Sequence, residues 1–332
     1  MTDQEMRDKH YKEVLIDADY LVYSAASSGE NTFYIWKDVN GNTIKRCESA
    51  KQAEMYKKEA EEFFNQDTSE WVREVGTELR PESIVYSVLD HMIAKLKTIV
   101  NADKYTFFIG GEGNFRYDLA TLVPYKGARK TEKPFYFQEA RQHIMRKYKA
   151  KVVNGIEADD AVSVNAYNDF IKNEGKPTKV LVSIDKDLLN TPSIYVNVEK
   201  GTFTYVSQED ADYSFALQML TGDKTDNILG LPNLGDEFRD KYSLPKRNGI
   251  GKKTAELILQ DLKGSSLQVL YARVLEAYSS FYTHPYEYTN WKGETVSASP
   301  EQLLDENCGL LYMMRKKGEQ WLAYKERTFT ND

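Results

Sequence analysis

The chain has 332 residues, a formal net charge of −7 and two cysteines, Cys47 and Cys308. Its length fits one large domain or two ordinary ones, and its 41% hydrophobic and 29% charged residues are typical of a globular protein with a core. The sequence contains no run of eighteen apolar residues, so we expect no membrane-spanning helix. The first eleven residues are polar and do not resemble a secretory signal. Two cysteines are too few for a disulfide framework or a cysteine zinc site, so we expect a reducing cytoplasm.

The first hundred residues alternate between strand and helix patterns. The apolar run 14–17 predicts a buried strand, and 20–26 predicts the start of a helix. An Asn-Gly turn between β-prone segments predicts a hairpin over 31–45. We expect the charged stretch 49–78 to be helical, and apolar residues at helical spacing predict another helix over 81–100.

The alternation continues beyond residue 100. The predicted elements are a strand at 105–109, a basic helix at 135–147, a helix at 157–172, a strand at 179–184 and a hairpin at 194–206. After residue 211 the pattern is helical and punctuated by glycines. Strands that alternate with helices indicate an α/β fold with a mostly parallel sheet, in which ligands bind beyond the carboxyl ends of the strands.

One segment of this acidic chain is strongly basic. Residues 125–151 hold nine Lys or Arg and two acids, a net charge of +7, so the rest of the chain sums to −14. Such a stretch indicates a local footprint for an anionic polymer, although a solvated helix face would give the same pattern.

Eight acids either follow a predicted strand, open a predicted helix or occupy the TGDKTDN segment. They are Asp17, Glu157, Asp159, Asp160, Asp185, Asp187, Asp223 and Asp226. Alone, each has an ordinary explanation as a helix cap or a turn residue. Gathered at one sheet edge they would repel strongly unless cations neutralised them, and removing them would change the net charge from −7 to +1. Oxygen ligands suit Mg²⁺ or Mn²⁺, and two such ions stabilise the attacking and leaving oxygens of a phosphodiester displacement.

A second anion-binding pattern lies near residue 250. Gly249 and Gly251 precede a helical run, with Lys252 and Lys253 beside them. A glycine turn that leads into a helix N-terminus exposes backbone N–H groups to a phosphate. A turn that only packs two helices is the alternative.

Taken in order, five segments resemble one known family. They are VLIDADYLVY near the start, NFRYDLATLVPYKGARK from Asn114, GIEADDAV from Gly155, VLVSIDKDLL from Val180, and LTGDKTDNILGLP with GIGKKTAELIL between Leu220 and Leu259. This set resembles the 5′-nuclease or flap-endonuclease family, in its bacteriophage 5′→3′ exonuclease branch, over residues 12–260. The resemblance implies a PIN-like mostly parallel sheet flanked by helices, a helical arch, and a helix–three-turn–helix that grips duplex DNA.

The resemblance also implies roles for individual residues. The eight acids match metal ligands for two or more Mg²⁺ or Mn²⁺ ions. Lys126 and Arg129 match the residues that hold the scissile phosphate, with Arg116 just upstream. The DNA-binding residues would be Tyr125, Lys130, Gly249, Gly251, Lys252 and Lys253, and the glycine hairpin is one that family members use to hold a K⁺ ion and the duplex backbone. Tyr125 could stack on a base of an unpaired end or be a packed core tyrosine.

The chain departs from the family pattern in two places. The family often has an aspartate after the second strand, where this chain has Gly110, Gly111 and Glu112. We expect Glu112 to supply an oxygen to the metal site, directly or through water. Residues 233–248 intervene before the glycine hairpin, and an Ω-loop is one structure that they could form.

The domains that we expect are a nuclease core over 1–210 with a basic arch at about 112–150, a DNA-binding region over 211–262, and a helical extension over 263–332. The expected activity is that of a metal-dependent 5′→3′ exonuclease or structure-specific 5′ flap endonuclease on duplex DNA with a 5′ end or flap. It would act in the cytoplasm, that of a host if the protein is viral. Alternatives are an RNase-H-type activity on RNA–DNA hybrids, a toxin-like PIN ribonuclease, which has no need of a duplex clamp, and a catalytically weakened DNA-binding protein of the same fold.

Overall fold

The chain forms two compact units. The computed structural model describes residues 1–129, 132–246, 249–282 and 284–329. The first unit comprises Met1–Tyr20, Leu96–Thr131 and Lys149–Asp332, and the second comprises Leu21–Lys95 and Glu132–Tyr148. The C-terminal extension after residue 262 shares one core with the helices before it.

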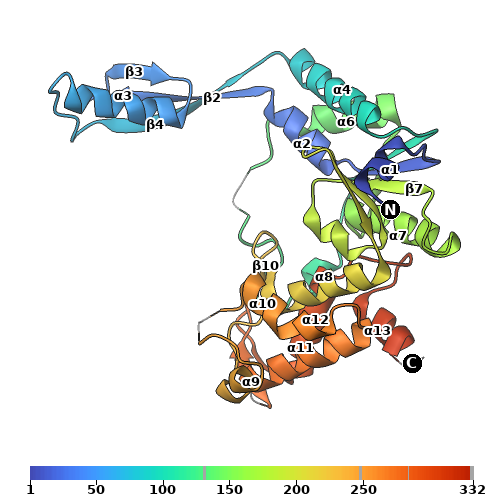
Figure 1. Cartoon of the computed structure of the whole chain (residues 1–332). Coiled ribbons are helices and arrows are strands. Elements are labelled where there is room, and N and C mark those ends of the chain that lie inside the picture. The colour runs from blue at the N-terminus through green and yellow to red at the C-terminus, as the bar shows by residue number, and fades with distance from the viewer. Residues whose placement is uncertain (130–131, 247–248, 283, 330–332) are drawn as a thin grey trace. The chain divides into compact units, whose positions relative to one another are not determined.

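A six-stranded sheet forms the centre of the first unit (Figure 1). Its strands, in spatial order, are β6 (Lys151–Val153), β5 (Tyr105–Gly110), β1 (Glu13–Asp17), β7 (Lys179–Val182), β8 (Ser193–Asn197) and β9 (Thr202–Val206). All neighbouring pairs are parallel except the β8–β9 hairpin. The predicted mostly parallel α/β fold is confirmed, and every residue of the central strand β1 is buried, as its apolar run requires.

Helix α7 (Ala158–Lys172) packs on the sheet through small and branched side chains. Ala158, Val162 and Ala166 are buried in one cluster with Leu15 of β1 and Leu181 of β7. Since α7 is the crossover that leads into a parallel strand, its N-terminus lies at the carboxyl edge of the sheet. The acids that open α7 are thereby placed at that edge.

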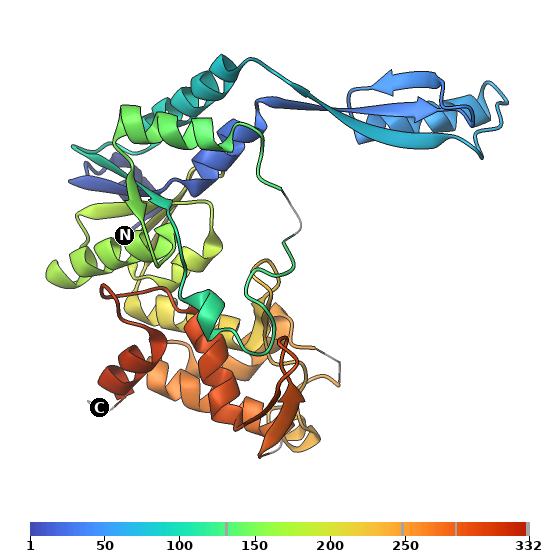
Figure 2. The ribbon, with the colours of Figure 1, turned by 180° about the vertical axis from the view of Figure 1, so that it is seen from behind.

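A second core consists of helices. They are α8 (Gln208–Thr221), α10 (Lys252–Leu259), α11 (Leu267–Phe281), α12 (Pro300–Leu311) and α13 (Trp321–Phe329). The extension after residue 263 also contains a hairpin, β12 (Tyr286–Thr289) with β13 (Thr295–Ala298), which the expectation of a helical extension did not include (Figure 2). Arg315, 1% exposed, is bonded to Asp212 of α8 with an Nη2–Oδ1 distance of 2.7 Å. Shorter elements are α1 (Asp3–Asp8), α5 (Arg116–Leu119), η1 (Lys186–Asn190), β10 (Gly222–Asp223), β11 (Ile228–Leu229) and η2 (Gln260–Leu262).

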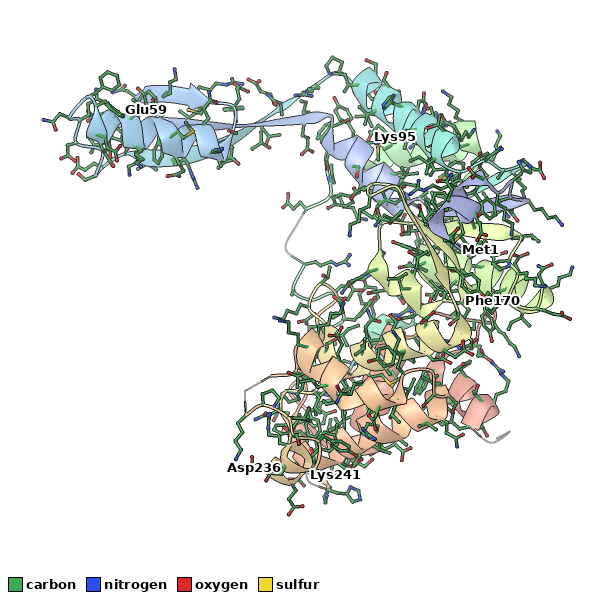
Figure 3. All side chains as sticks on the ribbon, viewed as in Figure 1. Met1, Glu59, Lys95, Phe170, Asp236 and Lys241 are labelled. Atoms are coloured by element: carbon green, nitrogen blue, oxygen red, sulfur yellow. The ribbon has the colours of Figure 1, made fainter. Side chains whose placement is uncertain are left out.

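The segment 233–248 is folded around one arginine over its described part. It contains α9 (Asp236–Lys241), labelled at both ends in Figure 3. Arg239 is 4% exposed. Its guanidinium donates hydrogen bonds to the carbonyl of Leu234 and to the side chain of Asn233. The loop is thus closed by a buried cation.

The second unit contains an antiparallel sheet in the order β3–β2–β4. Its elements are α2 (Asp19–Ser27, which begins in the first unit), β2 (Glu30–Lys37), β3 (Thr43–Cys47), α3 (Ala50–Glu62), β4 (Val72–Leu79), α4 (Glu82–Ile99, which ends in the first unit) and α6 (Phe137–Tyr148). The prediction of a helix over 49–78 is wrong after Glu62, because β4 pairs with β2 along its whole length. Trp36 fixes α3 to the sheet by donating from Nε1 to the carbonyl of Ala53 at 2.8 Å. No helix in the described part of the chain is long and apolar enough to span a bilayer.

We predict that Asp212→Ala lowers the free energy of unfolding by about 3–5 kcal/mol, because it leaves the buried Arg315 guanidinium without its anion. Urea denaturation measures the change. The control Glu209→Ala removes an exposed acid from the same helix and should change the free energy of unfolding by less than about 1 kcal/mol. Equal losses in both variants would contradict this role of the pair.

Candidate active site

Three elements bring carboxylates to the carboxyl edge of the parallel sheet. Asp17 ends β1 and is 8% exposed, and its oxygens accept hydrogen bonds from the hydroxyl of Ser183 at 3.0 Å and from the backbone N–H of Asp19 at 3.2 Å. Asp185 follows β7, and Asp159 lies in the first turn of α7. The edge therefore holds negative charges from segments far apart in the sequence.

These charges act on one another. Burial, the Asp19 carboxylate and the Asp185 carboxylate raise the pKa of Asp17 to about 7. Burial raises the pKa of Asp159 well above its ordinary value, and the charges of Glu157, Asp17, Asp160 and Asp185 raise it further. Like charges add to the effect of burial only at short range, so Asp17, Asp159 and Asp185 lie near one another at this edge.

A second group of acids surrounds Lys186. Burial and the charges of Asp185 and Asp223 raise the pKa of Asp187 to about 7. Asp223, 5% exposed, behaves differently: although burial opposes it, the charge of Lys186 and backbone N–H groups lower its pKa. The Lys186 Nζ lies 3.3 Å from Asp223 Oδ2, and Gln218 donates to Asp187 Oδ1 at 2.6 Å.

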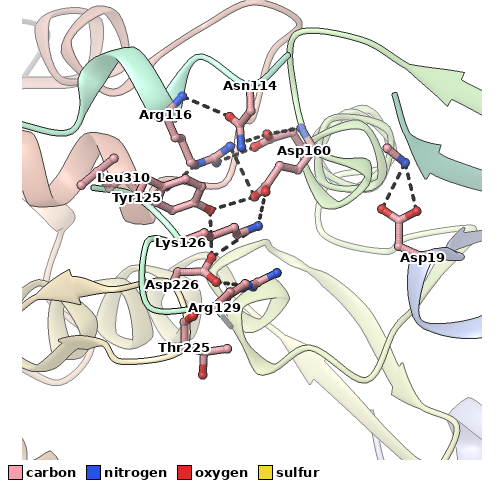
Figure 4. A network of polar contacts seen from close by, with 12 residues as sticks. Asp19, Asn114, Arg116, Tyr125, Lys126, Arg129, Asp160, Thr225, Asp226 and Leu310 are labelled. Carbon is pink, nitrogen blue, oxygen red and sulfur yellow. Dashed lines mark hydrogen bonds and ion pairs between the residues drawn. The ribbon is translucent and has the colours of Figure 1, made fainter. Parts of the chain in front are cut away.

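The segment after Pro124 supplies cations to this site (Figure 4). Lys126 forms an ion pair with Glu157 and lies 3.7 Å from Asp226 Oδ2, and Arg129 pairs with the other oxygen of Asp226. The backbone N–H of Lys126 donates to the carbonyl of Asp226 at 2.8 Å, and its φ of 56° is left-handed. A lysine adopts that conformation only where its surroundings hold it. The structure thus brings Lys126, Arg129, Glu157 and Asp226 together.

Tyr125 is a buried member of the same network. Its side chain belongs to the helical core, and the residue is 4% exposed. The hydroxyl lies 2.8 Å from Asp226 Oδ2 and 3.0 Å from Glu157 Oε2. A phenol has one proton, so it donates to one carboxylate at a time and keeps the two acids close. Of the two readings of Tyr125, the structure has the packed core tyrosine.

Arg116 and Asp160 form an ion pair inside the protein. Arg116 Nη1 and Nη2 donate to Asp160 Oδ2 and Oδ1 at 2.7 and 2.8 Å, and the two residues are 1% and 0% exposed. The backbone N–H of Glu157 also donates to Asp160, at 3.1 Å. Arg116, a catalytic candidate from the sequence, and Asp160, a candidate metal ligand, thus satisfy each other's charge inside the protein.

The end of β5 is contacted by Asp19, whereas the expected oxygen donor was Glu112. Glu112 is exposed, and its backbone forms hydrogen bonds with the Asn154 side chain and the Gly155 N–H. Asp19 instead reaches the end of β5, where both carboxylate oxygens accept from the N–H of Gly110 at 3.1 Å. Sequence reasoning did not select Asp19, although an acid two residues after Asp17 was a signal for it.

The donor chemistry of the site fits a hard divalent cation, since its side chains offer carboxylate oxygens. In the described residues, however, no three His, Cys, Asp or Glu side chains converge closely enough to hold an ion. Glu157 and Asp226 are turned toward Lys126 and Arg129, and Asp223 is paired with Lys186. Asp160 is paired with Arg116 in the same way, so internal cations engage at least four of the eight acids.

The glycine turn opens helix α10. Gly251 is the N-cap of α10, and Gly249 has a φ of 79° that other residues rarely adopt. Within the described residues, a Cβ at either position would meet no atom within 4 Å, so tight packing there does not account for these glycines. The Lys252 side chain is 80% exposed and lies 3.8 Å from Glu256. Lys130 lies outside the described residues.

No family model and no curated protein matches this chain. Solved structures of a bacteriophage T5 protein are similar to it. The T5 D15 protein co-crystallised with metal ions is 15% identical, covering 68% of this chain and 91% of that one, with a TM-score of 0.37. The T5 D15 flap endonuclease with DNA and metal ions is 14% identical, covering 69% and 90%, with a TM-score of 0.35. The T5 5′-exonuclease with bound zinc is 18% identical, covering 70% and 92%, with a TM-score of 0.35.

We predict that the metal-free protein loses stability as the pH rises from about 4 to about 7. The pKa of Asp17 is about 7 in the folded state and 3.8 ordinarily, so between these values the folded state keeps a proton that the unfolded state has released. Urea unfolding in a chelator, repeated across this pH range, measures the slope.

The variant Asp17→Asn should flatten that slope, whereas the exposed-acid control Asp118→Asn should not. Parallel pH profiles for Asp17→Asn and the unchanged protein would show that Asp17 ionises normally.

Proposed function

We propose that this protein is a metal-dependent 5′→3′ exonuclease and structure-specific 5′ flap endonuclease that hydrolyses DNA phosphodiesters. The observation that carries the proposal is the pairing of Lys126 and Arg129 with Glu157 and Asp226, beside carboxylates whose pKa values are raised by burial and by one another's charge. Two basic side chains that can bind a phosphate thus lie next to a group of carboxylates that can bind metal ions.

The carboxylates would hold the ions on which the reaction depends. Asp17, Asp159, Asp185 and Asp187 are the main candidates, with Asp19 as a further oxygen donor beside Asp17. Two Mg²⁺ ions would supply an activated water and stabilise the leaving 3′ oxygen, which gives a 5′-phosphate product. Asp160 is not placed among these candidates, since its oxygens hold Arg116.

Lys126 and Arg129 would stabilise negative charge on the scissile phosphate. Arg129 is half exposed, so it reaches solvent and an incoming backbone, whereas Lys126 is largely covered. Tyr125 would keep Glu157 and Asp226 in place while the two cations change partner, because its hydroxyl contacts both acids from within the core.

The glycine turn would hold the duplex away from the reacting phosphate. The N-terminus of α10 is open at Gly251, and Lys252 and Lys253 flank it. Backbone N–H groups at a helix N-terminus favour phosphate, and contacts of this kind carry little sequence readout. A K⁺ ion at this turn remains part of the proposal.

The proposal is tested by digestion of 5′-labelled duplex, 5′-flap and RNA–DNA hybrid substrates with and without Mg²⁺. We expect Mg²⁺-dependent release of 5′ products from the DNA substrates. Preference for the hybrid would favour the RNase-H-type alternative. Binding without cleavage in Mg²⁺ or Mn²⁺ would favour a DNA-binding protein of the same fold and would overturn the nuclease proposal.

We predict that Asp185→Asn lowers single-turnover cleavage by at least about a hundredfold, while duplex binding without metal is retained, because it removes one charge from the ion-holding edge. The control Asp118→Asn, at an exposed acid, should cleave normally. Cleavage by Asp185→Asn at the unchanged rate would remove Asp185 from the mechanism.

We expect Asp160→Ala to lower the free energy of unfolding by about 3–5 kcal/mol, because Arg116 stays buried without its partner.

We predict that changing Lys252 and Lys253 to alanine weakens duplex binding strongly and alters saturated turnover little. Each lysine that contacts phosphate displaces about one counterion, so each loss should flatten the slope of log affinity against log salt by roughly 0.9. The matched control changes Lys316 and Lys317, two adjacent exposed lysines, to alanine. An unchanged salt slope in the Lys252 and Lys253 variant would instead support a turn that only packs two helices.

A further inference from the structure

The C-terminal extension contacts the segment that leads to Lys126. Residues 120–124 connect α5 to the Tyr125–Arg129 segment, and α12 lies beside α5 (Figure 2). The sequence after residue 263 showed no motif, yet its side chains make the polar contacts to this connection that are described below. The extension therefore influences the positions of Lys126 and Arg129.

Glu306 of α12 is the principal contact. Its Oε1 accepts hydrogen bonds from the backbone N–H of Thr121 at 2.6 Å and from that of Leu122 at 2.9 Å, and its Oε2 accepts from the Thr121 hydroxyl. Residues 121 and 122 lie in no helix or strand, so a side chain replaces the usual backbone partner of their N–H groups. A single carboxylate thus fixes two successive residues.

The β12–β13 hairpin supports the same connection. Trp291, in its turn, donates from Nε1 to the carbonyl of Ala120 at 3.0 Å, and the Tyr288 hydroxyl lies 2.9 Å from the Thr121 hydroxyl. Gly309 lets α12 approach closely, since a Cβ there would lie 2.6 Å from Leu119 Cδ2. Backbone carbonyls of the extension also accept from the Arg116 guanidinium, at Leu310 (3.0 Å) and Tyr312 (2.7 Å).

Only Val123 and Pro124 separate the residues held by Glu306 from Tyr125. Proline has a fixed φ, so little freedom is available between the two anchored parts. At the other end, Lys126 is held by its backbone bond to Asp226 in a left-handed conformation. A shift at Thr121 would therefore be passed to the Lys126 side chain.

We propose that Glu306 is a positioning residue for the cleavage reaction: by anchoring Thr121 and Leu122 it sets the place of Lys126 beside Glu157 and Asp226. The hairpin residues Trp291 and Tyr288 assist it. This inference rests on the proposed function, in which Lys126 stabilises the scissile phosphate. Its first test does not depend on cleavage.

The first test is amide hydrogen exchange of residues 120–129 in Glu306→Ala, Glu306→Gln and Glu301→Ala. Losing a charged acceptor should raise the exchange rate of the Thr121 and Leu122 amides by about tenfold or more in Glu306→Ala. Glutamine keeps an acceptor for both N–H groups and offers a donor to the Thr121 hydroxyl, so Glu306→Gln should restore most of the protection. Glu301 is an exposed acid of the same helix, paired with Lys325, and its removal should leave this segment unchanged.

The second test compares single-turnover cleavage with duplex affinity. Glu306→Ala should lower the cleavage rate by about tenfold to a hundredfold, as loss of a supporting hydrogen bond around a site does, while duplex affinity stays the same. In a Lys126→Ala background the Glu306→Ala change should have little additional effect, since its influence passes through Lys126. Effects that multiply fully in the double variant would assign Glu306 a general structural role and overturn the proposal.

Should Glu306→Ala fail to fold, Trp291→Phe removes only the bond to the Ala120 carbonyl and should show the same pattern at smaller size. Unchanged exchange and unchanged cleavage in both variants would overturn the inference. If the unchanged protein cleaves nothing in Mg²⁺, the proposed function fails, and the exchange measurement still decides whether Glu306 positions the segment.

Discussion

Repulsion between carboxylates at the carboxyl edge of the sheet is the constraint around which the first unit is arranged. Asp17, Asp159, Asp185 and Asp187 are brought there by the topology of parallel strands, and their raised pKa values express the cost of burying these carboxylates near one another. Cations from elsewhere in the chain lower the cost. Lys186 pairs with Asp223, and one short segment delivers Lys126 and Arg129 to Glu157 and Asp226.

The Arg116–Asp160 pair extends this balance into the interior. A guanidinium has five N–H donors, and that of Arg116 is satisfied by both oxygens of Asp160 and by the carbonyls of Leu310 and Tyr312. The backbone N–H of Met314 reaches Asp160 as well, at 3.4 Å. A buried ion pair is tolerated only where such additional bonds satisfy it. The C-terminal extension provides them, which explains why it belongs to the same compact unit as the sheet.

Periodicity in the sequence predicted the parallel sheet and most helices, because those patterns reflect which face is buried. It failed at β4, whose partner β2 lies about forty residues earlier and leaves no local signal in a charged stretch. Acids after two strands and at the start of a helix likewise led us to expect Asp17, Asp159 and Asp185 near one another, since parallel topology brings these chain segments to one edge. A sequence of consecutive acids does not show which one turns inward, so the burial of Asp160 against Arg116 was not foreseeable. Glu306 lies nearly two hundred residues from the backbone that it holds, and nothing in its neighbourhood indicates that contact.

The basic stretch around residues 125–151 shows how a net charge can mislead. Lys126 and Arg129 are paired with acids of the site, and Lys147 is paired with Asp90, so less positive charge faces solvent than the sum of +7 suggests. If Lys126 and Arg129 turn to a phosphate as proposed, Glu157 and Asp226 lose their neutralising partners and regain their mutual repulsion. That repulsion would be relieved by a divalent cation. Phosphate binding and metal binding would then strengthen each other, and the coupling is reciprocal by thermodynamic necessity. The ion pairs of Lys126 and Arg129 with Glu157 and Asp226 thus compete with both ligands. Phosphate and a divalent cation bound together would break these pairs more readily than either ligand alone.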